Sequence, residues 1–205
     1  MDHEAKMNKL LNDGLDTSLV DTLEAPSKDY SALDVFYLGI AFIQALQSPD
    51  TSTQNGAVLV SADDRKILGY GCNRLPDGVE VNDARLERPA KYRFTEHAER
   101  NAIYHAAQQG NATLGTTLYV PWYACADCGR AIIQAGIKRV VGHDCYRQWY
   151  ESDGEELNDP NRMSWDDSIA DAVTMMQEAG VEMVHVTDNL NMGIKIRYNG
   201  VERDI

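Results

Sequence analysis

Four side chains in this sequence could form a metal-dependent catalytic site. His97 and Glu99 stand two residues apart, and Cys125-x-x-Cys128 follows after 25 intervening residues. One imidazole and two thiols suit Zn²⁺, and three protein ligands leave a fourth position for a reacting water. Zinc acidifies such a water, and Glu99 can accept its proton and pass it to a leaving group. The pattern therefore predicts His97, Cys125 and Cys128 as zinc ligands and Glu99 as the catalytic residue.

The two motifs together are more specific than either alone. H-x-E followed by C-x-x-C is the signature of zinc-dependent nucleobase deaminases, in which the glutamate is not a ligand. A closed structural zinc site is the alternative, and it would need a fourth ligand. That alternative is weaker because Glu99 would then have no role; its candidate ligands are His105, Cys72, His143 and Cys145.

Both motifs are predicted to open helices. Residues 97–108 are rich in Ala, Glu and Gln and end before Gly110, and residues 125–135 end before Gly136. Cys125 and Cys128 then lie at i and i+3 in a first turn, where the positive end of the helix favours thiolate.

The surrounding elements predict one α/β domain. A first pair of strands forms a hairpin, and the later alternation of helix and strand indicates parallel crossover units, with helices on both faces of the sheet. We expect a domain over residues 29–205 after an N-terminal extension over residues 1–28. Strands are predicted at 56–60, 66–73, 116–120, 138–141, 181–186 and 194–198, further helices at 29–47 and 165–179, and long loops at 74–95 and 144–164.

Composition narrows the class of partner. The 205 residues carry 19 Lys and Arg against 32 Asp and Glu, for a net charge of −13. Polynucleotide and anionic membrane surfaces both require a dense basic face, so neither is expected as a partner. The start lacks a signal-peptide pattern and the cysteines are sparse, which favours a cytoplasmic, reducing location with a metal-binding Cys pair.

Beyond these motifs, the chain resembles the deoxycytidylate (dCMP) deaminase family of the cytidine deaminase-like superfamily. The similarity runs from about Ser48 to Val186 and includes the stretches 48–60, 69–78, 91–92 and 132–137. It implies a three-layer α/β/α sandwich with a mixed, about five-stranded sheet. It also implies Zn²⁺ on the three predicted ligands, hydrolysis of dCMP to dUMP and ammonia, a homo-oligomer and a deoxynucleoside triphosphate effector.

The resemblance also implies substrate contacts. Asn73 matches the residue that contacts the sugar, and the Ala98 backbone N–H matches the donor to the base carbonyl. Several positions depart from the family pattern: Arg74 replaces a glycine, Ala124 replaces a proline, and Trp122 and Tyr123 occupy the turn that lines the pocket. These departures leave a 5-modified cytosine nucleotide or a nucleoside open as the substrate.

The phosphate of a nucleotide needs local positive charge. The 74–95 loop supplies five cations, and Arg74 is the best candidate because it adjoins Asn73; a solvated charge cluster is the equally weighted alternative. Trp122 and Tyr123, with Tyr92 and Phe94, could stack on the base. The five cations are Arg74, Arg85, Arg88, Lys91 and Arg93.

Two rival functions remain. Editing of a polynucleotide shares the zinc chemistry but needs a basic channel along the strand, which the net charge disfavours. A non-catalytic zinc- or nucleotide-binding module would not need the intact set of His97, Glu99, Cys125 and Cys128.

Overall fold

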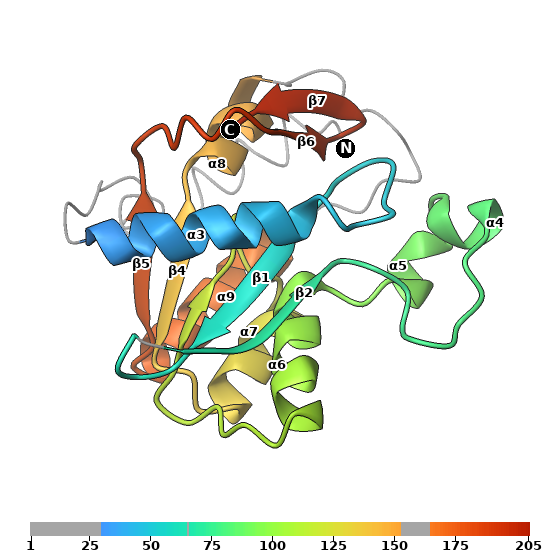
Figure 1. Ribbon diagram of the computed structural model, residues 1–205. Coiled ribbons are helices and arrows are strands. Elements are labelled where there is room, and N and C mark those ends of the chain that lie inside the picture. Colours follow the sequence, from blue (N-terminus) through green and yellow to red (C-terminus); the bar gives the residue numbers. More distant parts are fainter. Residues whose placement is uncertain (1–29, 65, 153–164) are drawn as a thin grey trace, which may run out of the picture.

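The five-stranded mixed sheet that the sequence predicts is confirmed. The computed structural model describes residues 30–64, 66–152 and 165–205 (Figure 1). The strands lie in the order β2-β1-β3-β4-β5; β1 is antiparallel to both its neighbours, and β3, β4 and β5 are parallel. Their bounds are β1 Gly56–Val60, β2 Ile67–Cys72, β3 Thr117–Tyr119, β4 Arg139–His143 and β5 Glu182–Val186.

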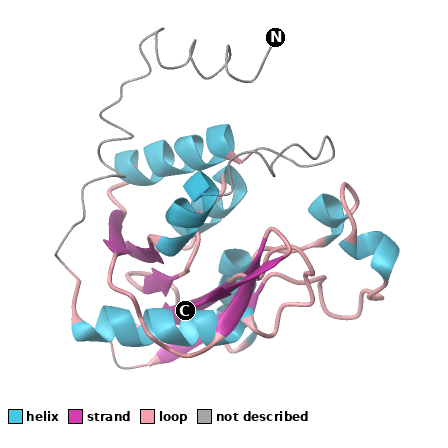
Figure 2. Cartoon of the chain, turned by 90° about the horizontal axis from the view of Figure 1, so that it is seen from above, coloured by secondary structure: helices cyan, strands magenta, loops and turns pink. Residues whose placement is uncertain are grey.

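Helices cover both faces of this sheet, which gives three layers (Figure 2). α3 (Ala32–Ala45) covers one face, and α6 (Ala98–Gln108), α7 (Ala126–Gln134) and α9 (Asp166–Glu178) cover the other. Alternation along β1 separates two cores: Val58 and Val60 pack with α3, whereas Ala57 and Leu59 pack with α6 and α7. All five strand residues are buried because both faces are covered.

Three predicted irregular or isolated segments contain more structure than expected. Within 74–95 lie two short helices, α4 (Asp83–Leu86) and α5 (Lys91–Phe94), and within 144–164 lies α8 (Cys145–Ser152). The terminal strand β6 (Lys195–Tyr198) pairs with β7 (Val201–Asp204), whose polar sequence gave no strand signal. Residues 1–29 and 153–164, which include the predicted extension and part of the second loop, lie outside the described residues.

A glycine in β2 lets α6 lie directly on the sheet. A Cβ atom at Gly69 would stand 2.2 Å from the Ala102 carbonyl oxygen of α6, closer than any side chain tolerates. The Asn101 amide of α6 also donates to the Cys72 carbonyl at 2.8 Å. These contacts fix the helix that opens with His97 and Glu99. Across the described ranges, no helix has the length and apolar character needed to cross a membrane.

Candidate active site

The three predicted zinc ligands converge at the ends of two helices. His97 is the N-cap of α6, Cys125 is the N-cap of α7, and Cys128 follows in the first turn of α7. The Nδ1 atom of His97 lies 3.5 Å from each sulfur, and all three ligand atoms lie within 4.8 Å of one another. Ser168 of α9 adds support, since its hydroxyl accepts the Ala126 N–H at 2.9 Å.

The electrostatics of the cluster favour a divalent cation. The adjacent Cys128 thiol, together with His97, outweighs the opposing effect of burial and lowers the pKa of Cys125 well below its ordinary value, which favours a thiolate there. The Arg100 guanidinium lies 3.7 Å from the Cys128 sulfur and forms an ion pair with Glu96. Imidazole, thiolate and a second thiol form a donor set that Zn²⁺ accepts.

A fourth protein ligand is not found among the residues that the structure describes. The group of close His, Cys and carboxylate ligands there consists of His97, Cys125 and Cys128 alone. Of the alternatives considered, the His143 ring accepts the Cys145 N–H at 2.9 Å, and His105 packs on Tyr70 at 4.2 Å between ring centroids. The site therefore has the three-ligand form typical of catalytic rather than structural zinc.

Glu99 lies beside this cluster with unused hydrogen-bonding capacity. Its side chain is 2% exposed, and the Oε2 atom has no hydrogen-bond partner within the described part of the chain. Burial raises the pKa of Glu99, and the nearby His97 partly opposes that effect. A buried carboxylate that gains a proton this readily is suited to proton transfer.

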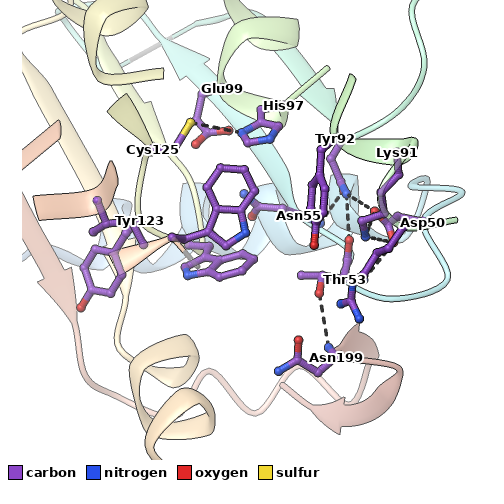
Figure 3. A pocket seen from close by; sticks show the side chains of 15 residues that line it. Asp50, Thr53, Asn55, Lys91, Tyr92, His97, Glu99, Tyr123, Cys125 and Asn199 are labelled. Atoms are coloured by element: carbon purple, nitrogen blue, oxygen red, sulfur yellow. Dashed lines mark hydrogen bonds and ion pairs between the residues drawn. The ribbon is translucent and has the colours of Figure 1, made fainter. Parts of the chain in front are cut away.

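The cluster opens into a cavity of about 80 Å³ (Figure 3). One part of its wall is aromatic and the other is polar and charged. Its lining residues are Asp50, Thr53, Asn55, Asn73, Arg88, Lys91, Tyr92, His97, Glu99, Trp122, Tyr123, Cys125, Trp165, Ile169 and Asn199.

Ring contacts with neighbouring side chains fix the two indole rings of the aromatic wall. Trp122 stacks on Tyr146 of α8 with ring centroids 5.2 Å apart and an interplanar angle of 7°. Trp165, directly before α9, sets its ring edge-on to His97 at 5.4 Å. A planar base could therefore lie beside the metal ligands and against indole rings whose positions are fixed.

The polar wall centres on a buried ion pair. The Lys91 ammonium contacts both carboxylate oxygens of Asp50, at 3.0 and 2.9 Å. Asn73 connects this pair to the next segment, because its Nδ2 donates to the Thr53 carbonyl at 2.8 Å and its Oδ1 accepts the Asn55 N–H at 2.7 Å. The loop before β1 is thus tied to the end of β2.

The structure brings most, but not all, of the predicted substrate residues to this cavity. Asn73, Trp122 and Tyr123 line it, and Ala98 is buried at the first position of α6 beside the ligand cluster. Arg74, predicted for the phosphate, lies elsewhere: its side chain is 45% exposed, pairs with Asp77 at 2.8 Å and does not line the cavity.

Two other cations of the 74–95 loop line the cavity, together with several residues for which the sequence analysis predicted no role. Arg88 and Lys91, from the same basic loop, reach the cavity, whereas Arg85 packs on Phe94. The sequence analysis assigned no role to the remaining wall residues, although three of them lie in the stretch 48–60 that resembles the family; they are Asp50, Thr53, Asn55, Trp165, Ile169 and Asn199.

Comparison with known proteins agrees with this site. A family model described as "Cytidine and deoxycytidylate deaminase zinc-binding region" matches residues 33–143. The deoxycytidylate deaminase of Homo sapiens is 34% identical over 119 residues, which cover 55% of this chain and 65% of that protein. An uncharacterized deaminase of Aliivibrio fischeri is 33% identical over 136 residues, covering 66% of this chain and 81% of that protein. The chain thus spans just under two thirds of the human relative.

A solved structure shares the fold. The dCMP deaminase of the cyanophage S-TIM5, in complex with dCMP and dUMP, matches with a TM-score of 0.55. The match is 23% identical in sequence and covers 77% of this chain and 98% of that chain. It places the present sheet and helices in the same architecture.

Proposed function

Because this chain belongs to the cytidine and deoxycytidylate deaminases that share that zinc-binding region, we propose that it hydrolyses dCMP to dUMP and ammonia. The observation that carries the proposal is the convergence of three zinc ligands and a buried, unpartnered Glu99 carboxylate at one cavity. The relatives named deoxycytidylate deaminase support dCMP as the first substrate to test.

The reaction divides between the metal and Glu99. His97, Cys125 and Cys128 would hold Zn²⁺, which as a Lewis acid would lower the pKa of water and so supply a hydroxide nucleophile for C4 of the cytosine. Glu99 accepts the proton of that water at Oε2 and delivers it to the departing amine. A C4–O bond forms and the C4–N bond breaks; one proton of the water converts the amino group to ammonia, and the other ends on ring N3 of the uracil.

The cavity wall would hold the rest of the nucleotide. Trp122, Tyr123 and Trp165 offer apolar surfaces to the base. The Ala98 N–H, in the first turn of α6, has no acceptor within its own helix and could donate to the base carbonyl. Arg88, rather than Arg74, is the residue we assign to the phosphate, because it lines the cavity and Arg74 does not.

An ammonia-release assay tests this proposal. We expect dCMP to outperform cytidine, deoxycytidine, CMP and dCTP, and a faster reaction with 5-substituted dCMP would move the assignment to a modified nucleotide. Glu99→Ala should keep one zinc per chain and lose about 10²- to 10⁴-fold in kcat, the usual contribution of a general acid–base residue. An active Glu99→Ala enzyme, or a zinc-loaded native protein inactive on every cytosine compound, would contradict the mechanism.

A matched pair of variants tests the phosphate contact. Arg88→Met should raise KM for dCMP by about 10- to 100-fold, as expected for a lost charged hydrogen bond, and leave KM for deoxycytidine nearly unchanged. Arg74→Met removes the same charge from the exposed pair with Asp77 and should change neither value. Equal effects of the two variants would remove Arg88 from the phosphate site.

The resemblance adds two further proposals, a homo-oligomeric assembly and binding of a deoxynucleoside triphosphate effector. Sedimentation of the zinc-loaded protein tests the first, and deamination kinetics with and without each of the four deoxynucleoside triphosphates test the second. A monomer would contradict the assembly, and kinetics that respond to none of the four would contradict the effector.

A further inference from the structure

One buried hydrogen-bond acceptor in the cavity is not used by the protein. Asn55, the residue directly before β1, is 8% exposed and lines the cavity. Its Oδ1 atom has no hydrogen-bond partner in the described part of the chain. Buried polar side chains are nearly always hydrogen-bonded, so an acceptor in this position calls for a partner that enters the cavity.

The backbone of Asn55 is fixed from one side by Asn73. The Asn55 N–H donates to Asn73 Oδ1 at 2.7 Å, and the Asn55 carbonyl accepts the Asn73 N–H at 3.0 Å. These two bonds hold the main chain of Asn55, so its side chain is the part that faces the cavity, where Figure 3 shows it between the ligand cluster and the polar wall.

The C-terminal hairpin fixes the same segment from the other side. Gln54 N–H donates to the Arg197 carbonyl at 2.8 Å, and the Gly200 N–H donates to the Ser52 carbonyl at 2.7 Å. The Asn199 N–H adds a bond to Thr53 Oγ1 at 3.3 Å. This hairpin, β6 and β7, lies outside the family match over residues 33–143, so part of what positions Asn55 comes from the region that follows that match.

Asn73 itself has little capacity left for a ligand. Its amide nitrogen donates to the Thr53 carbonyl at 2.8 Å and to Asp50 Oδ2 at 3.4 Å, and its oxygen accepts the Asn55 N–H. A sugar contact by Asn73 could use only the second lone pair of that oxygen, whereas Asn55 Oδ1 has no partner among the described residues. The geometry therefore makes Asn55 the better placed of the two asparagines for a contact to substrate.

The chemistry of a deoxycytidine nucleotide identifies the group that Asn55 can bind. At pH 8 the monophosphate is a dianion, so the molecule has two hydrogen-bond donors, the 4-amino group and the 3′-hydroxyl. The 4-amino group departs in the reaction and must lie beside Glu99 and the metal ligands. We propose that Asn55 accepts a hydrogen bond from the 3′-hydroxyl and thereby selects for an intact deoxyribose; this inference rests on the proposed function.

A substrate lacking the hydroxyl and a variant lacking the acceptor test the same bond. Native enzyme should use 2′,3′-dideoxycytidine monophosphate with a kcat/KM about 10- to 100-fold below that for dCMP, the cost of leaving a buried polar group unpaired. Asn55→Leu, which keeps the size of the side chain, should lose a similar factor with dCMP. With the dideoxy substrate, the kcat/KM of Asn55→Leu should lie less than about threefold below that of native enzyme, since the hydrogen bond is already absent there.

Controls separate this bond from a general loss of structure. Asn111→Leu changes a partly buried asparagine whose amide donates to the Leu68 carbonyl at 2.8 Å and which does not line the cavity; it should leave both substrates unaffected. Equal use of dCMP and the dideoxy substrate by native enzyme, a measurement that needs no variant, would overturn the proposal. So would losses that multiply when variant and dideoxy substrate are combined. Native enzyme that deaminates neither substrate would overturn the proposed function, and the role of Asn55 with it.

Discussion

The buried ion pair of the cavity wall allows a prediction whose magnitude follows from its surroundings. The side chains of Asp50 and Lys91 are 6% and 10% exposed, and their charged atoms lie 2.9 Å apart. Lys91→Met keeps the length of the side chain but leaves the Asp50 carboxylate buried without its cation. Removing one partner of such a pair usually costs about 3–5 kcal/mol of folding free energy.

The remaining contacts of Asp50 place the expected cost at the lower end of that range. Its carboxylate still accepts the Ser52 and Thr53 N–H groups at 2.8 and 3.1 Å. A loss of about 3 kcal/mol corresponds to a fall in Tm of about 6–12 °C for a domain of this size. Because the Lys91 ammonium is engaged by Asp50, we expect kcat/KM to fall by the same factor for dCMP and for deoxycytidine.

Thermal unfolding of the zinc-loaded protein, together with kinetics on both substrates, measures these effects. Arg74→Met is the control, since it breaks an exposed pair with Asp77 and should cost less than about 1 kcal/mol. The double variant Asp50→Asn, Lys91→Met should recover part of the lost stability because no buried charge remains. An unchanged Tm in Lys91→Met would refute the structural role, and a kinetic loss confined to dCMP would show that Lys91 binds phosphate instead.

Three further predictions concern the elements around the site. Gly69→Ala should cost about 1–3 kcal/mol and lower kcat, because its Cβ would clash with α6, whereas Gly142→Ala, whose Cβ has no contact closer than 3.5 Å, should be milder in urea unfolding and in activity. Arg100→Met should weaken zinc binding by about 10- to 100-fold in a chelator competition, because its guanidinium supports Cys128. Burial alone would raise the pKa of Asp34, but bonds from Arg139 and the Ser31 N–H lower it overall. Asp34→Asn should therefore destabilise the protein at neutral pH, and its difference from native protein in urea unfolding should shrink below about pH 4, where the carboxylate becomes protonated.

The ligand cluster could be predicted from the sequence because its geometry is local. Cys125 and Cys128 share one helical turn, and His97 and Glu99 share another, so helix formation alone sets each pair. The convergence of the two helices then follows from the crossover on one face of the sheet. The parallel half of the sheet was predictable for the same reason, since helix and strand alternate along the chain there.

The polar wall could not be predicted, because it depends on contacts between distant segments. Arg74 was preferred for the phosphate since it follows Asn73, but neighbouring residues of an extended chain face opposite sides; Asn73 is buried and Arg74 is exposed. Asn55 lies in the stretch 48–60 that resembles the family, but nothing in that stretch assigns it a role. The role we propose for it depends on the contacts with Asn73 and the C-terminal hairpin that hold its main chain.

The charges of the polar wall show which phosphorylated ligands the acidity of the chain disfavours. A net charge of −13 opposes a polynucleotide, whose many phosphates extend over a wide surface. A mononucleotide places its phosphate at one point, so the local arrangement of charge decides instead. There Asp50 offsets the charge of Lys91, while Arg88 reaches the cavity from the same loop and donates to the Ser52 hydroxyl at 2.7 Å. Selection of a single small phosphate ester then depends on the position of the Arg88 guanidinium and on Asn55, which lines the same wall. Both residues can be substituted without changing the metal ligands.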